Sequence, residues 1–93
     1  MIVSFRCRQT EKLFLREAVA PQWREFAPVA LRKLNYLHGA KRLEDFRVPP
    51  SNRFEKLKGD RKHQYSIRIN KKWRVCFEYD EGNAYNVEIV DYH

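Results

Sequence analysis

The chain has 93 residues, 43% of them hydrophobic and 14% aromatic, which suits one small folded domain over residues 1–93 and excludes an intrinsically disordered chain. The net charge of +7 and the isoelectric point of about 9.7 favour a polyanionic partner: nucleic acid, an acidic membrane surface or an acidic protein. No apolar run approaches the roughly 20 residues of a membrane span, and MIVSFRCRQT lacks the apolar stretch of a secretory signal. We therefore expect a cytoplasmic protein with no membrane partner.

The first half of the chain predicts a short strand followed by two helices. Alternation over residues 2–7 indicates the strand, and Thr10 is a plausible N-cap for a helix over residues 11–18. Pro28 suits the first turn of a second helix over residues 29–40, because proline lacks only a donor that would be unpaired there. Gly39 is expected to end this helix.

The second half changes to the two-residue period of β-strands. The segment 47–53 contains Pro49-Pro50 and is expected to be a loop. Strands are predicted over residues 65–69, 73–79 and 85–89, with turns at 70–72 and at 80–83. The fold class expected is therefore α+β, with the helices packed on an antiparallel sheet.

The alternation also divides the strand residues between two faces. Arg68, Arg74, Glu88 and Tyr92 fall on the face opposite the apolar one, where two guanidiniums on neighbouring strands could grip a phosphate. Asp91 and His93 share the parity of the buried face, although parity alone leaves their direction open at a strand end. The residues expected to face the helices are Tyr65, Ile67, Ile69, Trp73, Val75, Phe77, Tyr85, Val87 and Ile89.

Basic residues are concentrated immediately before and within this sheet. Residues 75–93 contain no Lys or Arg, whereas residues 53–74 are rich in them and hold only two acids, Glu55 and Asp60. Such segregation favours a polyanion-binding surface, although a solvated basic face without a ligand would have the same composition. The residues we expect to bind RNA are Arg53, Lys56, Arg61, Lys62, Arg68, Lys71 and Lys72.

The remaining chemistry fits RNA cleavage without a metal. The two cysteines, Cys7 and Cys76, show no metal-ligand spacing with the histidines, so neither a metal nor another cofactor is expected. RNA supplies its own nucleophile, the 2′-hydroxyl, and the protein must move protons and stabilise the extra negative charge on the phosphate. Lys58 and Arg74 suit charge stabilisation, and Asp91, Tyr92 and His93 could share the proton transfers.

Four segments together resemble one family: MIVSF, LKGDR, YSIRINKKWRVCFEY and VEIVDYH. In this order they are similar to HigB-type toxins of the RelE/ParE superfamily, which belong to bacterial toxin–antitoxin systems. The resemblance implies a compact RelE-like RNase fold and cleavage of mRNA in the ribosomal A site. It also implies neutralisation by a HigA-like helix-turn-helix antitoxin, through which the toxin would reach operator DNA indirectly.

The resemblance also assigns site residues. It carries the family's loop lysine to Lys58, its strand arginine to Arg74, and its final acid, tyrosine and histidine to Asp91, Tyr92 and His93. Several members have a histidine just before the LKG block, where this chain has Glu55 and Lys56. Two other function classes stay open: a ParE-like toxin that poisons DNA gyrase, and a nucleic-acid-binding module without catalysis. Neither of them needs the DYH segment.

Overall fold

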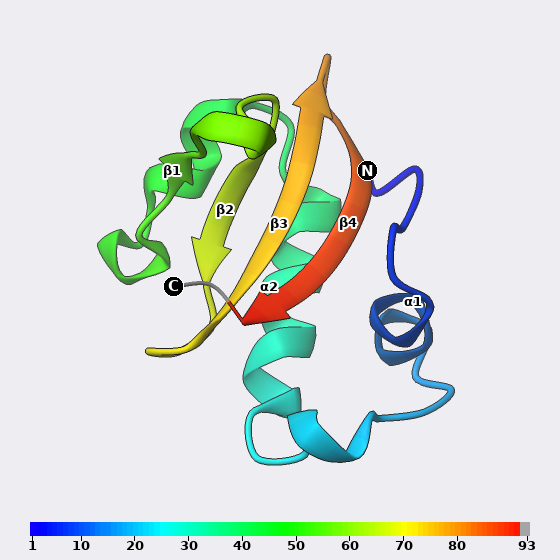
Figure 1. The fold of residues 1–93 in the computed structure, drawn as a ribbon. Coiled ribbons are helices and arrows are strands. Elements are labelled where there is room, and N and C mark those ends of the chain that lie inside the picture. Colours follow the sequence, from blue (N-terminus) through cyan, green and yellow to red (C-terminus); the bar gives the residue numbers. More distant parts are fainter. Residues whose placement is uncertain (92–93) are drawn as a thin grey trace.

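The structure is a computed structural model and describes residues 1–91. Four strands form one antiparallel sheet in the order β1-β2-β3-β4 (Figure 1). The helix α2 lies behind this sheet in Figure 1, and the shorter α1 lies beside β4. The expected α+β class is confirmed. The elements are α1 (Arg8–Phe14), α2 (Ala27–Gly39), β1 (Glu55–Lys56), β2 (Tyr65–Arg68), β3 (Trp73–Asp80) and β4 (Asn83–Asp91).

The N-terminal segment runs alongside β4 without forming a continuous strand. It makes two isolated parallel bridges, Ile2 with Ala84 and Phe5 with Val87, in place of the strand expected over residues 2–7. The amide nitrogen of Val3 donates to the carbonyl of Ala84 at 2.8 Å, so the free edge of β4 is partly covered.

The helix α1 begins earlier than its sequence indicates, and the N-cap prediction is wrong. Cys7 occupies the N-cap position, and Thr10 lies inside the helix with none of its surface exposed. The Thr10 hydroxyl accepts a hydrogen bond from the backbone nitrogen of Ile89 at 3.0 Å. Thr10 therefore joins α1 to β4, a role that depends on a residue 79 positions away.

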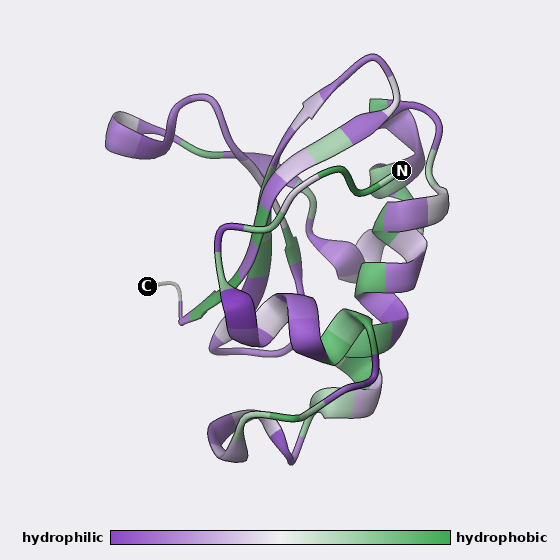
Figure 2. Ribbon diagram, turned by 90° about the vertical axis from the view of Figure 1, so that its right-hand side faces the viewer, coloured by the Kyte–Doolittle hydropathy of each residue, from purple (hydrophilic) through white to green (hydrophobic). Residues whose placement is uncertain are grey.

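The helix α2 supplies most of the helical side of the core. Pro28 lies in its first turn and Gly39 is its last residue, as expected, although the helix starts two residues earlier, at Ala27. Leu34 and Leu37 are fully buried against the sheet. Hydrophobic and hydrophilic residues alternate along the ribbon of α2 in Figure 2, and the buried hydrophobic residues of this helix belong to the core that also includes Ile67, Val75 and Phe77 of the sheet.

The three predicted strands are confirmed, but one face assignment is wrong. Tyr85 pairs with Glu78, whereas Cys76 pairs with Glu88, so β4 contains one residue more than β3 between these pairs. Asn86 takes a left-handed conformation there, with φ 53°, as expected for a β-bulge. The extra residue reverses the alternation, and Tyr85 shares a face with Glu78 instead of with the buried Val87.

Candidate functional site

The guanidinium of Arg74 lies on the open face of the sheet, the face away from α2, and donates two hydrogen bonds. Its Nε donates to the hydroxyl of Ser66 on β2 at 2.7 Å, and its Nη2 donates to the carbonyl oxygen of Arg53 at 2.5 Å. The side chain is only 12% exposed. Within residues 1–91 its Nη1 has no hydrogen-bond partner, so this edge of the guanidinium can donate hydrogen bonds to an anion.

Arg68 stands directly opposite Arg74 in the pairing of β2 with β3. Like charges at opposite positions of a sheet destabilise the pair, so this arrangement needs a reason beyond folding. Arg68 is itself oriented, because its Nε donates to the carbonyl oxygen of Asn70 at 3.0 Å. A bound phosphate would neutralise both guanidiniums at once.

These two arginines share a pocket of about 320 Å³, which we call the arginine pocket. It contains one carboxylate, that of Glu55, whose Oε1 lies 3.8 Å from Nη2 of Arg74. Half of the Glu55 side chain is exposed, so this ion pair neutralises the pocket only weakly. Four positive side chains against one negative make the pocket electropositive, which favours an anion. Its lining residues are Arg53, Glu55, Arg68, Asn70, Lys71 and Arg74.

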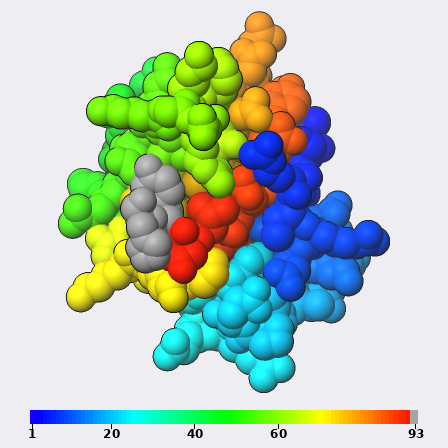
Figure 3. Space-filling view, in the orientation of Figure 1, coloured from blue at the N-terminus to red at the C-terminus, as the bar shows by residue number. Residues whose placement is uncertain are grey.

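The structure places Lys58 outside the arginine pocket. Lys58 precedes the short 3₁₀ helix η4 (Gly59–Arg61) and is exposed. It borders a second pocket of about 570 Å³ together with Lys56 and Lys62. In Figure 3, which looks onto the open face, residues near 50–65 and near 70 flank the exposed part of β4. Most of the predicted basic residues therefore line one of two pockets, and Arg61 and Lys72 line neither of them.

Two of the residues expected to bind RNA are engaged in ion pairs. Arg61 Nη1 lies 3.3 Å from Glu88 Oε2, and the same carboxylate is 3.5 Å from Nη1 of Arg6. Arg61 thereby ties η4 to β4. Lys72 Nζ lies 3.5 Å from Asp91 Oδ2 at the end of β4. Arg61 and Lys72 therefore still add positive charge near the site, but the carboxylates of Glu88 and Asp91 neutralise part of it.

The predicted proton-transfer group falls only partly within the described residues. Asp91 is exposed and pairs with Trp73 in the sheet, which gives it the parity of the core-facing side. Its carboxylate nevertheless reaches Lys72. Tyr92 and His93 lie outside the described residues.

The buried thiol of Cys76 is not available for chemistry. Cys76 lies between Ser66 and Glu88 in the cross-strand pairing and is fully buried. Burial, the largest cause, raises the pKa of its thiol to about 11, and the nearby Glu88 adds to this. Over residues 1–91 there is no group of three or more side chains that could hold a metal ion. No helix in this range is long and apolar enough to cross a bilayer.

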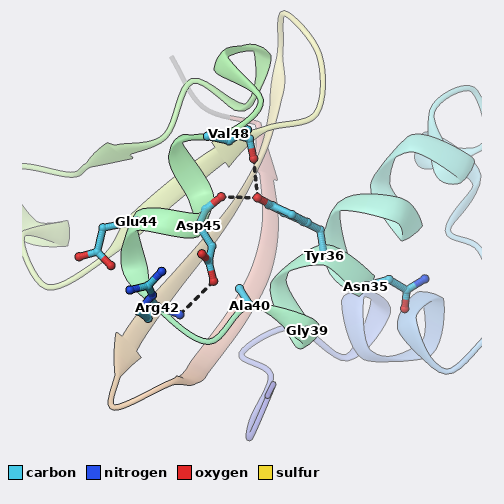
Figure 4. A pocket seen from close by; sticks show the side chains of 8 residues that line it. All are labelled: Asn35, Tyr36, Gly39, Ala40, Arg42, Glu44, Asp45 and Val48. Atoms are coloured by element: carbon cyan, nitrogen blue, oxygen red, sulfur yellow. Dashed lines mark hydrogen bonds between the residues drawn. The ribbon is translucent and has the colours of Figure 1, made fainter.

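A larger pocket of about 630 Å³, at the C-terminal end of α2, has a structural role (Figure 4). The hydroxyl of Tyr36 is hydrogen-bonded to the carbonyl oxygens of Asp45 and Val48. The carboxylate of Asp45 accepts from the backbone nitrogens of Lys41 and Arg42, and these bonds lower its pKa. Burial raises the pKa of Tyr36. Both polar groups hold the segment after α2 in place, and neither is poised to exchange a proton near neutral pH.

Two groups that orient the guanidinium of Arg74 were not predicted: the hydroxyl of Ser66, and the backbone carbonyl oxygen of Arg53, whose side chain was expected to bind RNA. Ser66 could have been found, because its parity places it on the same face as Arg68 and Arg74. The carbonyl oxygen of Arg53 could not, because a backbone acceptor from a loop leaves no signal in the sequence.

Comparison with known proteins agrees with this architecture. Residues 11–93 match the family described as RelE-like toxin of type II toxin–antitoxin system HigB. The fold is thus a compact RelE-like α+β domain, and the chain belongs to the HigB-like toxin family.

Individual relatives align over part of their length. The chain is 47% identical over 55 residues to Toxin HigB-1 of Vibrio cholerae, covering 59% of this chain and 58% of the relative. It is 37% identical over 65 residues to an uncharacterized protein of Haemophilus influenzae, covering 70% and 63%. It is 43% identical over 37 residues to Endoribonuclease HigB of Proteus vulgaris, covering 40% of each. The chain therefore spans about three-fifths of the first two relatives.

Proposed function

We propose that this chain is an endoribonuclease and the toxin of a type II toxin–antitoxin pair, acting on mRNA in the ribosomal A site. The arginine pocket carries the proposal, because two guanidiniums fixed opposite each other suit a phosphate whose negative charge increases during the reaction. The name of the Proteus vulgaris relative, Endoribonuclease HigB, supports the reaction type. The site of action is the cytoplasm, where ribosomes translate.

The proposed reaction is attack of the RNA 2′-hydroxyl on the adjacent phosphate, followed by loss of the 5′-oxygen. Arg74 and Arg68 hold the phosphate and stabilise the additional charge, and Lys58 contributes positive charge from the neighbouring loop. Asp91, Tyr92 and His93 share withdrawal of the 2′-proton and protonation of the leaving oxygen. Because the nucleophile comes from RNA itself, no metal is required, and DNA is bound without being cut.

The proposed protein partner is a HigA-like helix-turn-helix antitoxin, which would bring the toxin to operator DNA. Support comes from the family, whose description places its members in a type II toxin–antitoxin system. A small helix-turn-helix reading frame beside the toxin gene is the observation that bears on this partner most directly.

Arg74→Met tests the role of the arginine pocket. Purified protein added to translating ribosomes should cut the mRNA, and Arg74→Met should lower the cleavage rate by about 10²- to 10³-fold, as for loss of one transition-state donor. Arg74→Lys, the matched control for charge, should recover only part of the rate, because lysine cannot bind a phosphate with a planar pair of donors. Primer extension on the mRNA gives both the rate and the cleavage position.

Other outcomes separate the alternatives. Intact transcripts together with arrested DNA replication would support a gyrase-directed toxin. Binding to RNA without cleavage would support a non-catalytic module. Cleavage of an mRNA that carries a 2′-deoxyribose at the cleavage position would contradict attack by the 2′-hydroxyl.

A further inference from the structure

The segment between α2 and β1 is anchored to α2 at two points one helical turn apart. It contains the 3₁₀ helices η2 (Leu43–Arg47) and η3 (Pro50–Asn52). Tyr36 holds the first part through the carbonyl oxygens of Asp45 and Val48, as Figure 4 shows. Lys33, three residues before Tyr36, donates from its ammonium to Oδ1 of Asn52. Residues three apart share one face of a helix, so α2 presents both anchors to this segment together.

Asn52 is the residue that accepts the hydrogen bond from Lys33 in the second of these two contacts. It is completely buried, and its Nδ2 lies 3.4 Å from the carbonyl oxygens of both Phe46 and Val48. Its Oδ1 is occupied by the ammonium of Lys33. Leaving either end of a buried amide unpaired costs about 1–3 kcal/mol, so the Asn52 side chain has one well-defined position.

The next residue supplies the acceptor for Arg74. Arg53 has a left-handed backbone, with φ 43° and ψ 50°, and its carbonyl oxygen receives Nη2 of Arg74. A non-glycine residue in this region costs free energy and persists only where its surroundings fix it. On the C-terminal side of Arg53, the ring of Phe54 stacks on that of Tyr65, with the ring centroids 5.5 Å apart. Arg53 is thus held between a buried amide and a stacked ring.

Lys33 reaches Asn52 at a cost. Its ammonium is partly withdrawn from water, and this burial, followed by the nearby Arg32, lowers the pKa of Lys33. A charge that is desolvated for one hydrogen bond is a poor source of stability compared with an apolar side chain of the same length. The contact is better explained by what it orients.

We propose that Lys33 is a positioning residue for Arg74: by holding Asn52, it fixes the Arg53 carbonyl oxygen against the guanidinium and so orients Nη1 toward the phosphate. The ribonuclease part of this inference rests on the proposed function. The connection crosses the molecule, from a helix on the covered side of the sheet to the open face. Lys33 does not touch the RNA.

The test compares Lys33→Met with Lys33→Arg and with Arg32→Met, the neighbouring exposed cation on the same helix. Lys33→Met should lower kcat by about 10- to 100-fold with KM nearly unchanged, the size of effect expected from a small misplacement of a catalytic group. Lys33→Arg should restore most of the rate, and Arg32→Met should leave it unchanged. If Lys33→Met does not fold, Lys33→Gln makes the same comparison with a polar side chain.

A double-mutant cycle distinguishes positioning from loss of stability. In the Arg74→Lys background, Lys33→Met should cost little further activity, because the group it orients is already gone. An equal loss in both backgrounds, or a loss that only follows the fraction unfolded, would overturn the proposal.

A second readout does not depend on catalysis. In ¹⁵N-labelled protein, restricted rotation of the Arg74 guanidinium should give separate Nη–H signals in the wild type and averaged signals in Lys33→Met. Unchanged signals would overturn the positioning role even if activity fell. If the wild type cuts no RNA, the proposed function fails, and these signals still decide whether Lys33 orients Arg74.

Discussion

At the scale of single residues, buried polar side chains set the geometry around the site. Thr10, Asn52 and Ser66 are each inaccessible to solvent, and each bonds a group from another element of the fold. Thr10 receives a strand amide, Asn52 receives an ammonium, and Ser66 receives the guanidinium of Arg74. Because an unpaired buried group is costly, each of these side chains specifies one arrangement of its neighbours.

Thr10→Val tests how much the buried hydrogen bond between Thr10 and Ile89 contributes to stability. Valine has nearly the same shape but cannot accept the hydrogen bond from the nitrogen of Ile89, so we expect a loss of about 1–3 kcal/mol in the free energy of unfolding. Thr10→Ser keeps the hydroxyl and should lose clearly less. Urea denaturation followed by tryptophan fluorescence gives both values. Equal losses would show that the methyl group contributes as much as the hydrogen bond, which would contradict a special role of the hydroxyl.

At the scale of elements, the bulge in β4 decides which side chains reach the open face. Asn86 occupies it, and its Nδ2 donates to Glu78 Oε2 at 2.7 Å while its backbone nitrogen donates to the hydroxyl of Ser4 at 2.9 Å. In the part of β4 before the bulge, the side chain of Tyr85 points to the open face. In the part after the bulge, the side chains of Val87 and Ile89 point into the core. The bulge thus keeps Glu88 on the same face as Cys76 and within reach of Arg61.

Asn86→Val should weaken β4 specifically. A β-branched residue resists the left-handed conformation, which costs roughly 1–2 kcal/mol for an ordinary side chain, and it also loses the bond to Glu78. Asn86→Gly keeps the backbone conformation and loses only the side-chain contact, so it should be the milder change. Hydrogen exchange of the amides of β4 would locate the effect. A uniform change across the sheet would argue against a local role of the bulge.

At the scale of the whole molecule, the charge of +7 is unevenly distributed. The arginine pocket and the neighbouring lysine-lined pocket concentrate positive side chains on the open side of the sheet. Two acids of β3 and β4 are engaged within the protein: Glu88 pairs with Arg6 and Arg61, and Glu78 accepts a hydrogen bond from Asn86. The result is a polarised molecule whose open face favours a polyanion.

This distribution predicts a local salt dependence of RNA binding. Affinity for a 2′-O-methyl single-stranded RNA, which cannot be cut, should fall with salt, and Lys71→Met should reduce the slope of log K against log salt by about 0.7. Arg32→Met removes the same charge from α2 and should leave the slope unchanged. Fluorescence anisotropy at several salt concentrations measures both. Equal changes of the slope in the two variants would show that RNA affinity depends on the net charge of the protein rather than on the charges that line the arginine pocket.

The sequence by itself determined the three long strands, the end of α2 at Gly39 and the shared face of Arg68 and Arg74. These features follow from alternation, from proline and glycine, and from hydrophobic spacing, all of which act between residues close in the chain. The resemblance of four sequence segments to HigB-type toxins predicted the family, and the family match confirms that prediction. The resemblance also assigned catalytic roles, and this assignment stays a prediction for all five residues: Lys58, Arg74, Asp91, Tyr92 and His93.

Only the tertiary structure decided how these parts meet. The two-residue strand β1 is too short to give a periodic signal, yet it places Glu55 beside Arg74. One bulged residue reversed the face of Tyr85, and one buried hydroxyl made Thr10 a link to β4 in place of a helix cap. Lys58 and Arg74 entered different pockets, and Lys33 came within reach of the loop behind the site. Each outcome depends on contacts between distant residues, which the free energy of packing the whole chain selects and local pattern cannot encode.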